Sequence, residues 1–106
     1  MTDLDGIWGS VVNELMLDLV HQTLILEISV PSHLEKASHH RLRFEGVSDF
    51  RFANRIPGPW SYVELTEVRV RPTTNGRIVA ELLLWSEEAS LNVEAERATL
   101  DDFPLG

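Results

Sequence analysis

The sequence contains no cysteine, a single lysine and no long apolar run. The absence of cysteine excludes a disulfide scaffold, a Cys-based zinc site and a thiol nucleophile. No stretch approaches the ~20 apolar residues that span a bilayer, and the acidic residues 1–5 lack the basic and apolar segments of a secretory signal. We therefore expect a cytoplasmic protein without a membrane partner.

Basic residues are also few, and they are unevenly placed. Nine Lys and Arg residues against 17 acids give a net charge of −8, which opposes binding to nucleic acid, because phosphates require clustered cations. Residues 1–35 carry −6, residues 36–55 carry +3, and residues 56–106 carry −5. A basic segment thus lies inside an acidic chain.

The length and composition are those of one globular domain. A chain of 106 residues with 43% hydrophobic residues is large enough to bury a core, but not two independent cores. We therefore expect a single domain over residues 1–106.

Alternation of apolar and polar residues is the strongest pattern, and it predicts strands with one buried face. In residues 90–96, for example, Leu91 and Val93 share one face while Asn92 and Glu94 share the other. The first predicted strand would turn its leucines at positions 15, 17 and 19 toward the core. Strands are expected over 13–20, 23–30, 41–47, 62–71, 77–85 and 90–96.

Turn residues organise these segments into an antiparallel fold. Asn75-Gly76 predicts a type I′ hairpin, and His21-Gln22 is short enough for another tight connection. A change of apolar face within 62–71 predicts a bulge near residues 66–67. Segment 77–85, apolar on both faces, would be a central strand, and the last strand would be an edge. About six strands then form a sandwich or a half-open barrel.

Residues 48–60 break this pattern. Pro57-Gly58-Pro59 ends any regular element, and the residues before it could form a helical turn. We therefore expect a short helical or irregular excursion there.

Histidines are the best candidates for metal or acid–base chemistry. His33, Glu35, His39 and His40 lie within eight residues, and such side chains could bind zinc. Their spacing matches no metal-site signature. No serine lies in a nucleophile elbow, and no glycine-rich phosphate loop is present. We therefore expect no enzymatic activity, no metal and no cofactor.

One segment combines aromatic residues with arginines in the net-basic part of the chain. It contains Phe50, Arg51, Phe52, Arg55 and Trp60. Aromatic and Arg side chains are enriched at protein interfaces. Two interpretations are open: the aromatic side chains close an end of the core, or the segment binds an acidic partner protein or a second copy of this acidic chain.

Three segments resemble small bacterial proteins of the immunity protein 50 type and related uncharacterised domains of polymorphic toxin systems. They are Leu42-Arg43-Phe44-Glu45-Gly46-Val47, Trp60-Ser61-Tyr62-Val63-Glu64-Leu65-Thr66-Glu67-Val68 and Leu91-Asn92-Val93-Glu94-Ala95-Glu96. The resemblance covers most of the chain in order. It implies a cytosolic, non-enzymatic protein that binds and blocks a toxin, and it transfers no catalytic or binding residue.

The leading hypothesis is a non-catalytic protein-binding domain, in particular an immunity-type inhibitor of a bacterial toxin. One alternative is a small-ligand-binding β domain, whose mouth residues 48–60 would close. Another is a histidine-dependent metal protein. A homodimer is also consistent with the sequence.

Overall fold

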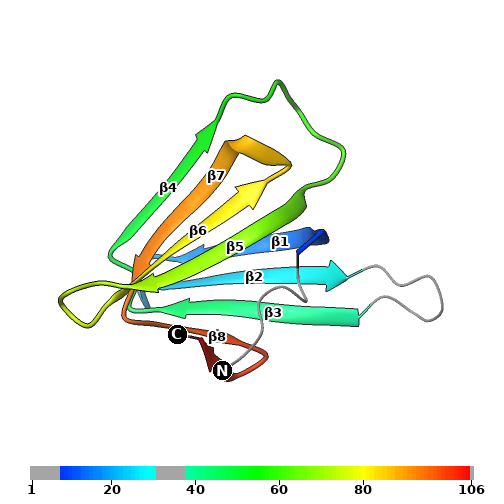
Figure 1. The fold of residues 1–106 in the computed structure, drawn as a ribbon. Helices are drawn as coiled ribbons and strands as arrows, with labels where there is room; N and C mark the ends of the chain where they lie inside the picture. Colours follow the sequence, from blue (N-terminus) through cyan, green and yellow to red (C-terminus); the bar gives the residue numbers. More distant parts are fainter. Residues whose placement is uncertain (1–7, 31–37, 106) are drawn as a thin grey trace.

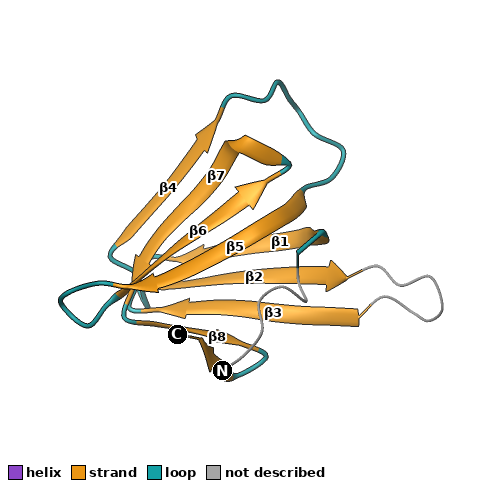
Figure 2. Cartoon of the chain, viewed as in Figure 1, coloured by secondary structure: helices purple, strands orange, loops and turns teal. Residues whose placement is uncertain are grey.

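The computed structural model describes residues 8–30 and 38–105, and every regular element in these ranges is a β-strand (Figure 1, Figure 2). Within the same ranges there is no helix long and apolar enough to cross a membrane. The strands, in chain order, are β1 (Ser10–Asp18), β2 (Thr23–Val30), β3 (Ser38–Glu45), β4 (Asp49–Asn54), β5 (Glu64–Pro72), β6 (Ile78–Leu84), β7 (Ser86–Ala95), β8 (Arg97–Leu100) and β9 (Phe103–Leu105).

All nine strands belong to one antiparallel sheet, in the order β4-β7-β6-β5-β1-β2-β3-β8-β9. Figure 1 shows the strands converging at one end of the molecule and fanning apart at the other. The sheet is not closed, because β4 and β9 lie at its two ends. The mainly β, antiparallel class is thus confirmed, but the arrangement is a single open, bent sheet and not the two separate sheets of a sandwich.

The six strands predicted from alternation are present as β1, β2, β3, β5, β6 and β7, but the predicted total of about six is wrong. Asp49–Asn54 forms β4, paired with β7, where a helical or irregular excursion was expected at 48–60. Within 48–60, only Ser48 and residues 55–60 lie outside strands. Strands β8 and β9 were missed because four and three residues are too few to show a period.

The positions of two strands in the sheet were also predicted. Strand β6 lies between β5 and β7, which confirms that 77–85 is a central strand. The expected edge strand at 90–96 is not at an edge, because β7 lies between β4 and β6. The reason is that β4, which pairs with the edge of β7 away from β6, was not recognised as a strand.

The core lies on the inner face of the bent sheet, at alternate positions along each strand. Leu24, Leu26 and Ile28 of β2 and Leu42 and Phe44 of β3 are at most 1% exposed. Each such side chain contributes roughly 1.5–3 kcal/mol through burial. The other half of the sheet adds Leu65, Val68, Ile78, Ala80, Leu82, Leu84, Ala89, Leu91, Val93 and Ala95.

Two bulges keep apolar residues on this inner face. In β5 the register against β6 shifts between Leu65 and Glu67, which confirms the predicted bulge. In β1 a second shift lies between Val12 and Glu14. It turns both Val12 and Leu15 toward the core face, since each then lies opposite a buried residue of β2.

The hairpin predicted at Asn75-Gly76 joins β5 and β6, but its turn is not type I′. Only Gly76 of that pair has a positive φ, of 81°. Its N–H donates to Thr73 O at 3.4 Å, and Thr73 N donates to Arg77 O at 2.8 Å. This pattern is a type I turn followed by a left-handed glycine, the usual three-residue hairpin loop.

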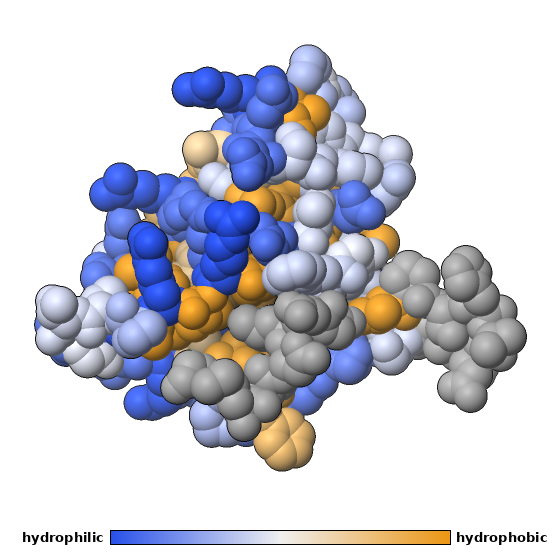
Figure 3. Space-filling model, viewed as in Figure 1, coloured by the Kyte–Doolittle hydropathy of each residue, from blue (hydrophilic) through white to orange (hydrophobic). Residues whose placement is uncertain are grey.

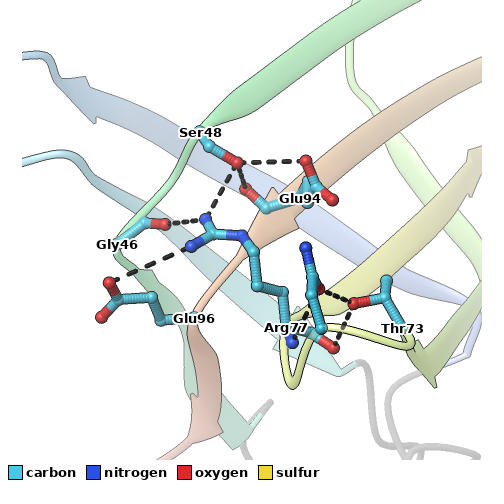
Figure 4. A network of polar contacts seen from close by, with 7 residues as sticks. Gly46, Ser48, Thr73, Arg77, Glu94 and Glu96 are labelled. Carbon is cyan, nitrogen blue, oxygen red and sulfur yellow. Dashed lines mark hydrogen bonds and ion pairs between the residues drawn. The ribbon is translucent and has the colours of Figure 1, made fainter.

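Arg77 ties this hairpin to the bend between β3 and β4 (Figure 4). Its Nη2 donates to Gly46 O at 2.6 Å and to Ser48 Oγ at 2.8 Å. Its Nη1 lies 4.0 Å from Glu96 Oε1, at the junction of β7 and β8. The Arg77 side chain is largely buried. Its contacts hold the β5–β6 hairpin against the β3–β4 bend and the β7–β8 junction, the two places where the chain passes between the β4 side and the β3 side of the sheet.

Asp101 holds the turn between β8 and β9 against β3. Its Oδ1 accepts a hydrogen bond from Arg41 N at 2.9 Å, and its Oδ2 lies 2.6 Å from His40 Nδ1. Burial by itself would raise the pKa of Asp101, but the contacts with His40 and Arg41 outweigh it and lower the pKa below 3.8. The stability from the charged form is therefore present above the unfolded pKa and is lost as the pH falls through the folded pKa.

We expect Asp101→Asn, which keeps an acceptor for Arg41 N, to lower the free energy of unfolding at neutral pH by less than about 1 kcal/mol. The effect is small because the carboxylate is 41% exposed and water screens its charge. The difference from the wild type should vanish below the folded pKa. Urea unfolding at neutral and acidic pH measures it, and an equal difference at both would show that the charge of Asp101 contributes nothing.

Candidate functional site

Strand β4 divides the candidate binding residues between its two faces. Phe50 and Phe52 point to the inner face, since their partners on β7 are core residues. Arg51 points to the outer face, where its Nε lies 3.0 Å from Asp49 Oδ2. Arg55 follows the strand and is exposed. The structure therefore brings the two Phe residues together but does not bring Arg51 to them.

Trp60 joins the aromatic residues from the irregular segment after β4. Its ring centroid lies 6.5 Å from that of Phe52 and 6.4 Å from that of Trp85, both edge to face. Tyr62 lies against Trp85 with a centroid distance of 4.6 Å. Trp60 Nε1 donates to Pro57 O at 3.0 Å, which fixes the indole ring and satisfies its donor.

The structure agrees in part with the first interpretation of these aromatic residues, that they close an end of the core, and the second stays a prediction. Phe50 and Trp60 are half-buried and pack against the core. Phe52, on the same face, remains 54% exposed. The aromatic side chains thus border the core without closing it.

The aromatic residues line a pocket of about 280 Å³ on the inner face of the sheet. Strands β1, β6 and β7 supply the remaining wall. All lining side chains are apolar: Val12, Leu15, Phe50, Phe52, Trp60, Val63, Leu84 and Leu91. Such a site favours an alkyl or aromatic group, because a polar group buried there would lack hydrogen-bond partners.

The β1 wall of this pocket is open to solvent. Leu15 and Leu17 lie opposite Leu26 and Leu24 of β2, so they face the core side as predicted. Their partners are fully buried, yet Leu15 is 39% and Leu17 is 38% exposed. Strand β1 pairs with β5 only near its start, and its remaining length extends beyond that half of the sheet. Leu19, also predicted to point inward, lies in the turn and is 78% exposed.

A second hollow, of about 330 Å³, continues from the pocket along β1. It shares Phe50 with the pocket and is lined by Leu17, Leu19 and Val47 as well as by polar residues of the adjoining turns. Together the two hollows form an apolar groove between β1 and β4. We define the apolar groove by Val12, Leu15, Leu17, Phe50, Phe52 and Trp60.

Sequence reasoning found the β4 side of the apolar groove and missed the β1 side. Leucines at alternate positions of a strand indicate a core face, and nothing in that pattern tells whether another layer covers it. The shortness of the pairing between β1 and β5 leaves these leucines exposed, and pairing between distant strands is not visible in the sequence.

Hydrophilic side chains dominate the outer face of the β4 half of the sheet. On the face shown in Figure 3 they gather over β4 to β7, with hydrophobic side chains exposed among them in the middle of the molecule. A hollow of about 460 Å³ on the outer face includes Asp49, Arg51 and Glu94. Asp49 pairs with Arg51, and Glu94 accepts a hydrogen bond from Ser48 at 3.1 Å. Because these charged groups already have partners, the apolar groove is the better candidate site.

The histidines do not assemble into a metal site in the described part of the chain. His39 Nδ1 lies 3.0 Å from Ser29 Oγ, His40 contacts Asp101, and His21 contacts Asp18 in the β1–β2 turn. Residues 8–30 and 38–105 contain no group of three His, Cys, Asp or Glu residues that could hold a metal. His33 and Glu35 of the considered cluster lie outside these residues.

No protein-family model and no curated protein matches the chain. Its structure is similar to the crystal structure of an uncharacterized protein from Neisseria gonorrhoeae, with a TM-score of 0.67 at 9% sequence identity. The similarity covers 91% of this chain and 93% of that chain. At this sequence identity the similarity shows a shared fold, and no conclusion about function follows from it.

Proposed function

We propose that this chain is a non-catalytic protein-binding domain that receives its partner in the apolar groove. The observation that carries the proposal is the exposure of Leu15, Leu17 and Phe52 on the face of the sheet that elsewhere forms the core. Contiguous apolar surface bordered by polar residues marks interaction sites in soluble proteins. A partner segment that covers these side chains completes the inner layer of the sheet.

The composition of the apolar groove suits an anchored contact between proteins. Aromatic residues at the centre of an interface contribute most of the binding energy, and polar residues around them exclude water. Phe52 and Trp60 are such aromatic residues, and polar residues of the β1–β2 turn and the β3–β4 bend border the groove. The partner should therefore insert apolar side chains at the groove and make polar contacts around it.

The class of the partner follows from the resemblance to immunity proteins. That resemblance implies a toxin as the protein that is bound and blocked. The absence of a nucleophile elbow and of a phosphate loop from the sequence supports a role in binding.

Affinity capture from the lysate of the native host, followed by mass spectrometry, tests the proposal when variants are compared. We expect a stoichiometric partner to be retained by the wild type and lost by Phe52→Glu, since a charge in the apolar groove must be desolvated. Phe52 is half-exposed, so this variant should still fold.

Phe103→Glu is the matched control. Phe103 is 66% exposed on β9, at the opposite end of the sheet from β4, and it undergoes the same chemical change. A partner lost by both variants, or by neither, would contradict binding in the apolar groove.

The pocket within the groove also supports a second candidate, a small-ligand-binding β domain. Its volume of about 280 Å³ is near the lower end of ligand sites, so it suits a single ring or a short alkyl chain. A ligand that binds only the native state raises the melting temperature. Thermal shifts with a panel of small aromatic and alkyl compounds test this, and an unchanged melting temperature throughout would exclude such ligands.

A further inference from the structure

The two ends of the sheet are protected to different extents against pairing with another strand. Strand β9, at one end, is three residues long and contains Pro104, which has no N–H to donate. Strand β4, at the other end, is six residues long and contains no proline and no lysine. Soluble proteins usually shorten, charge or bend their edge strands. The two charged residues of β4, Asp49 and Arg51, pair with each other on one face and leave the main-chain edge of the strand available to another strand.

The main-chain groups that β4 presents outward follow from the alternation of an antiparallel ladder. Arg55 N donates to Glu88 O of β7 at 2.9 Å, and residues two apart on a strand face the same neighbour. The odd-numbered residues of β4 therefore bond to β7. The N–H and C=O groups of Phe50, Phe52 and Asn54 face away from the sheet.

We propose that β4 pairs antiparallel with β4 of a second copy of this chain, about a two-fold axis at Phe52. In this register Phe52 lies opposite Phe52 of the second copy, and Phe50 lies opposite Asn54. These are the residues with outward main-chain groups, so each pair can exchange both of its hydrogen bonds.

Among the registers with an axis at Arg51, Phe52 or Ala53, charge complementarity favours the one at Phe52. Asp49 shares the outer face with Arg51, and the bond from Arg55 N to Glu88 O continues the same alternation, which puts Arg55 on that face as well. The two-fold axis at Phe52 then places Asp49 of each copy opposite Arg55 of the other. An axis at Arg51 would place that arginine opposite itself. An axis at Ala53 would place Arg51 opposite Arg55. Both alternatives set like charges against each other, which destabilises a strand pair.

The same register covers apolar surface that β4 leaves open. Phe52 is 54% exposed although it lies on the inner face, and a second β4 brings another Phe52 against it. Aromatic cross-strand pairs are among the stabilising pairs of antiparallel sheets. The pairing shares Phe52 with the apolar groove, but its charged contacts lie on the outer face of β4. Variants of Asp49 and Arg55 therefore test the pairing without changing a residue of the groove.

Sedimentation equilibrium of the full chain over a wide range of concentrations tests the proposal. The wild type should be a reversible dimer. Asp49→Arg and Arg55→Asp should each weaken dimerisation at least about tenfold, because each creates two like-charge pairs across the interface. The double variant with both changes should restore the dimer, since it exchanges the charges and keeps them complementary.

Arg71→Asp controls for the change of net charge, because Arg71 is exposed on β5, which is not at the edge of the sheet. It should dimerise as the wild type does. A wild type that stays monomeric at every concentration would overturn the proposal. So would single variants that dimerise as well as the wild type, or a double variant no stronger than the single ones.

Discussion

Leu24→Ala should lower the free energy of unfolding by about 2–5 kcal/mol, whereas Leu17→Ala should lower it by about 1 kcal/mol or less. The two leucines lie directly opposite each other on β2 and β1 and face the same side. Leu24 is fully buried, so its truncation leaves a cavity. Leu17 is 38% exposed, and solvent fills the space that its truncation leaves. Denaturant unfolding of both variants measures the difference.

Leu26→Ala and Leu15→Ala repeat the comparison at the next inward-facing pair along the same hairpin. Truncation of the buried Leu26 should again lower the free energy of unfolding several times more than truncation of Leu15. Equal losses within either pair would mean that another part of the protein covers the inner face of β1. The apolar groove would then be part of the core and could not receive a partner.

Gly46→Ala should lower the free energy of unfolding by about 2–3 kcal/mol, from two separate causes. The φ of Gly46 is +66°, a conformation that costs a residue with a Cβ about 1–2 kcal/mol. The added Cβ would also lie 2.5 Å from Glu96 Cγ, so the Glu96 side chain must move. A side chain at this position therefore strains the backbone of the bend that Arg77 holds and displaces the Glu96 side chain.

Gly76→Ala separates these two causes. Gly76 also has a positive φ, of +81°, but its Cβ would meet nothing within 4 Å, so only the backbone cost applies. Adding Glu96→Ala to Gly46→Ala should recover the part of the lost free energy of unfolding that is due to the steric clash. If Gly46→Ala is no more costly than Gly76→Ala in denaturant unfolding, the Glu96 side chain moves aside freely and the packing at the bend is loose.

The sequence predicted the fold well where alternation was long and uninterrupted. Strand β2 was predicted with its observed bounds, and the bulge in β5 was recognised from the change of apolar face. Strand β4 was missed because its alternation spans only six residues and precedes two prolines. The type I′ turn was wrong because Asn75-Gly76 also suits a loop with a single left-handed residue.

The candidate site was only partly predictable, for a physical reason. Local composition indicated the aromatic residues of β4 and Trp60, and the structure places Phe50, Phe52 and Trp60 around one pocket. The separation of Arg51 from them follows from the strand that was not recognised, since neighbours on a strand point to opposite faces. The exposed leucines of β1 depend on how strands far apart in the sequence pair, which local pattern does not determine.

Binding in the apolar groove is tested most directly by methyl NMR of this chain titrated with the partner that affinity capture recovers. The leucine methyl resonances of Leu15 and Leu17 should shift or broaden on binding, because they form the exposed β1 wall of the groove. The methyl resonances of Val79, on the opposite face of the sheet, should remain unchanged. Shifts at Val79 with none at Leu15 and Leu17 would place the partner on the outer face and contradict the proposed function of the groove.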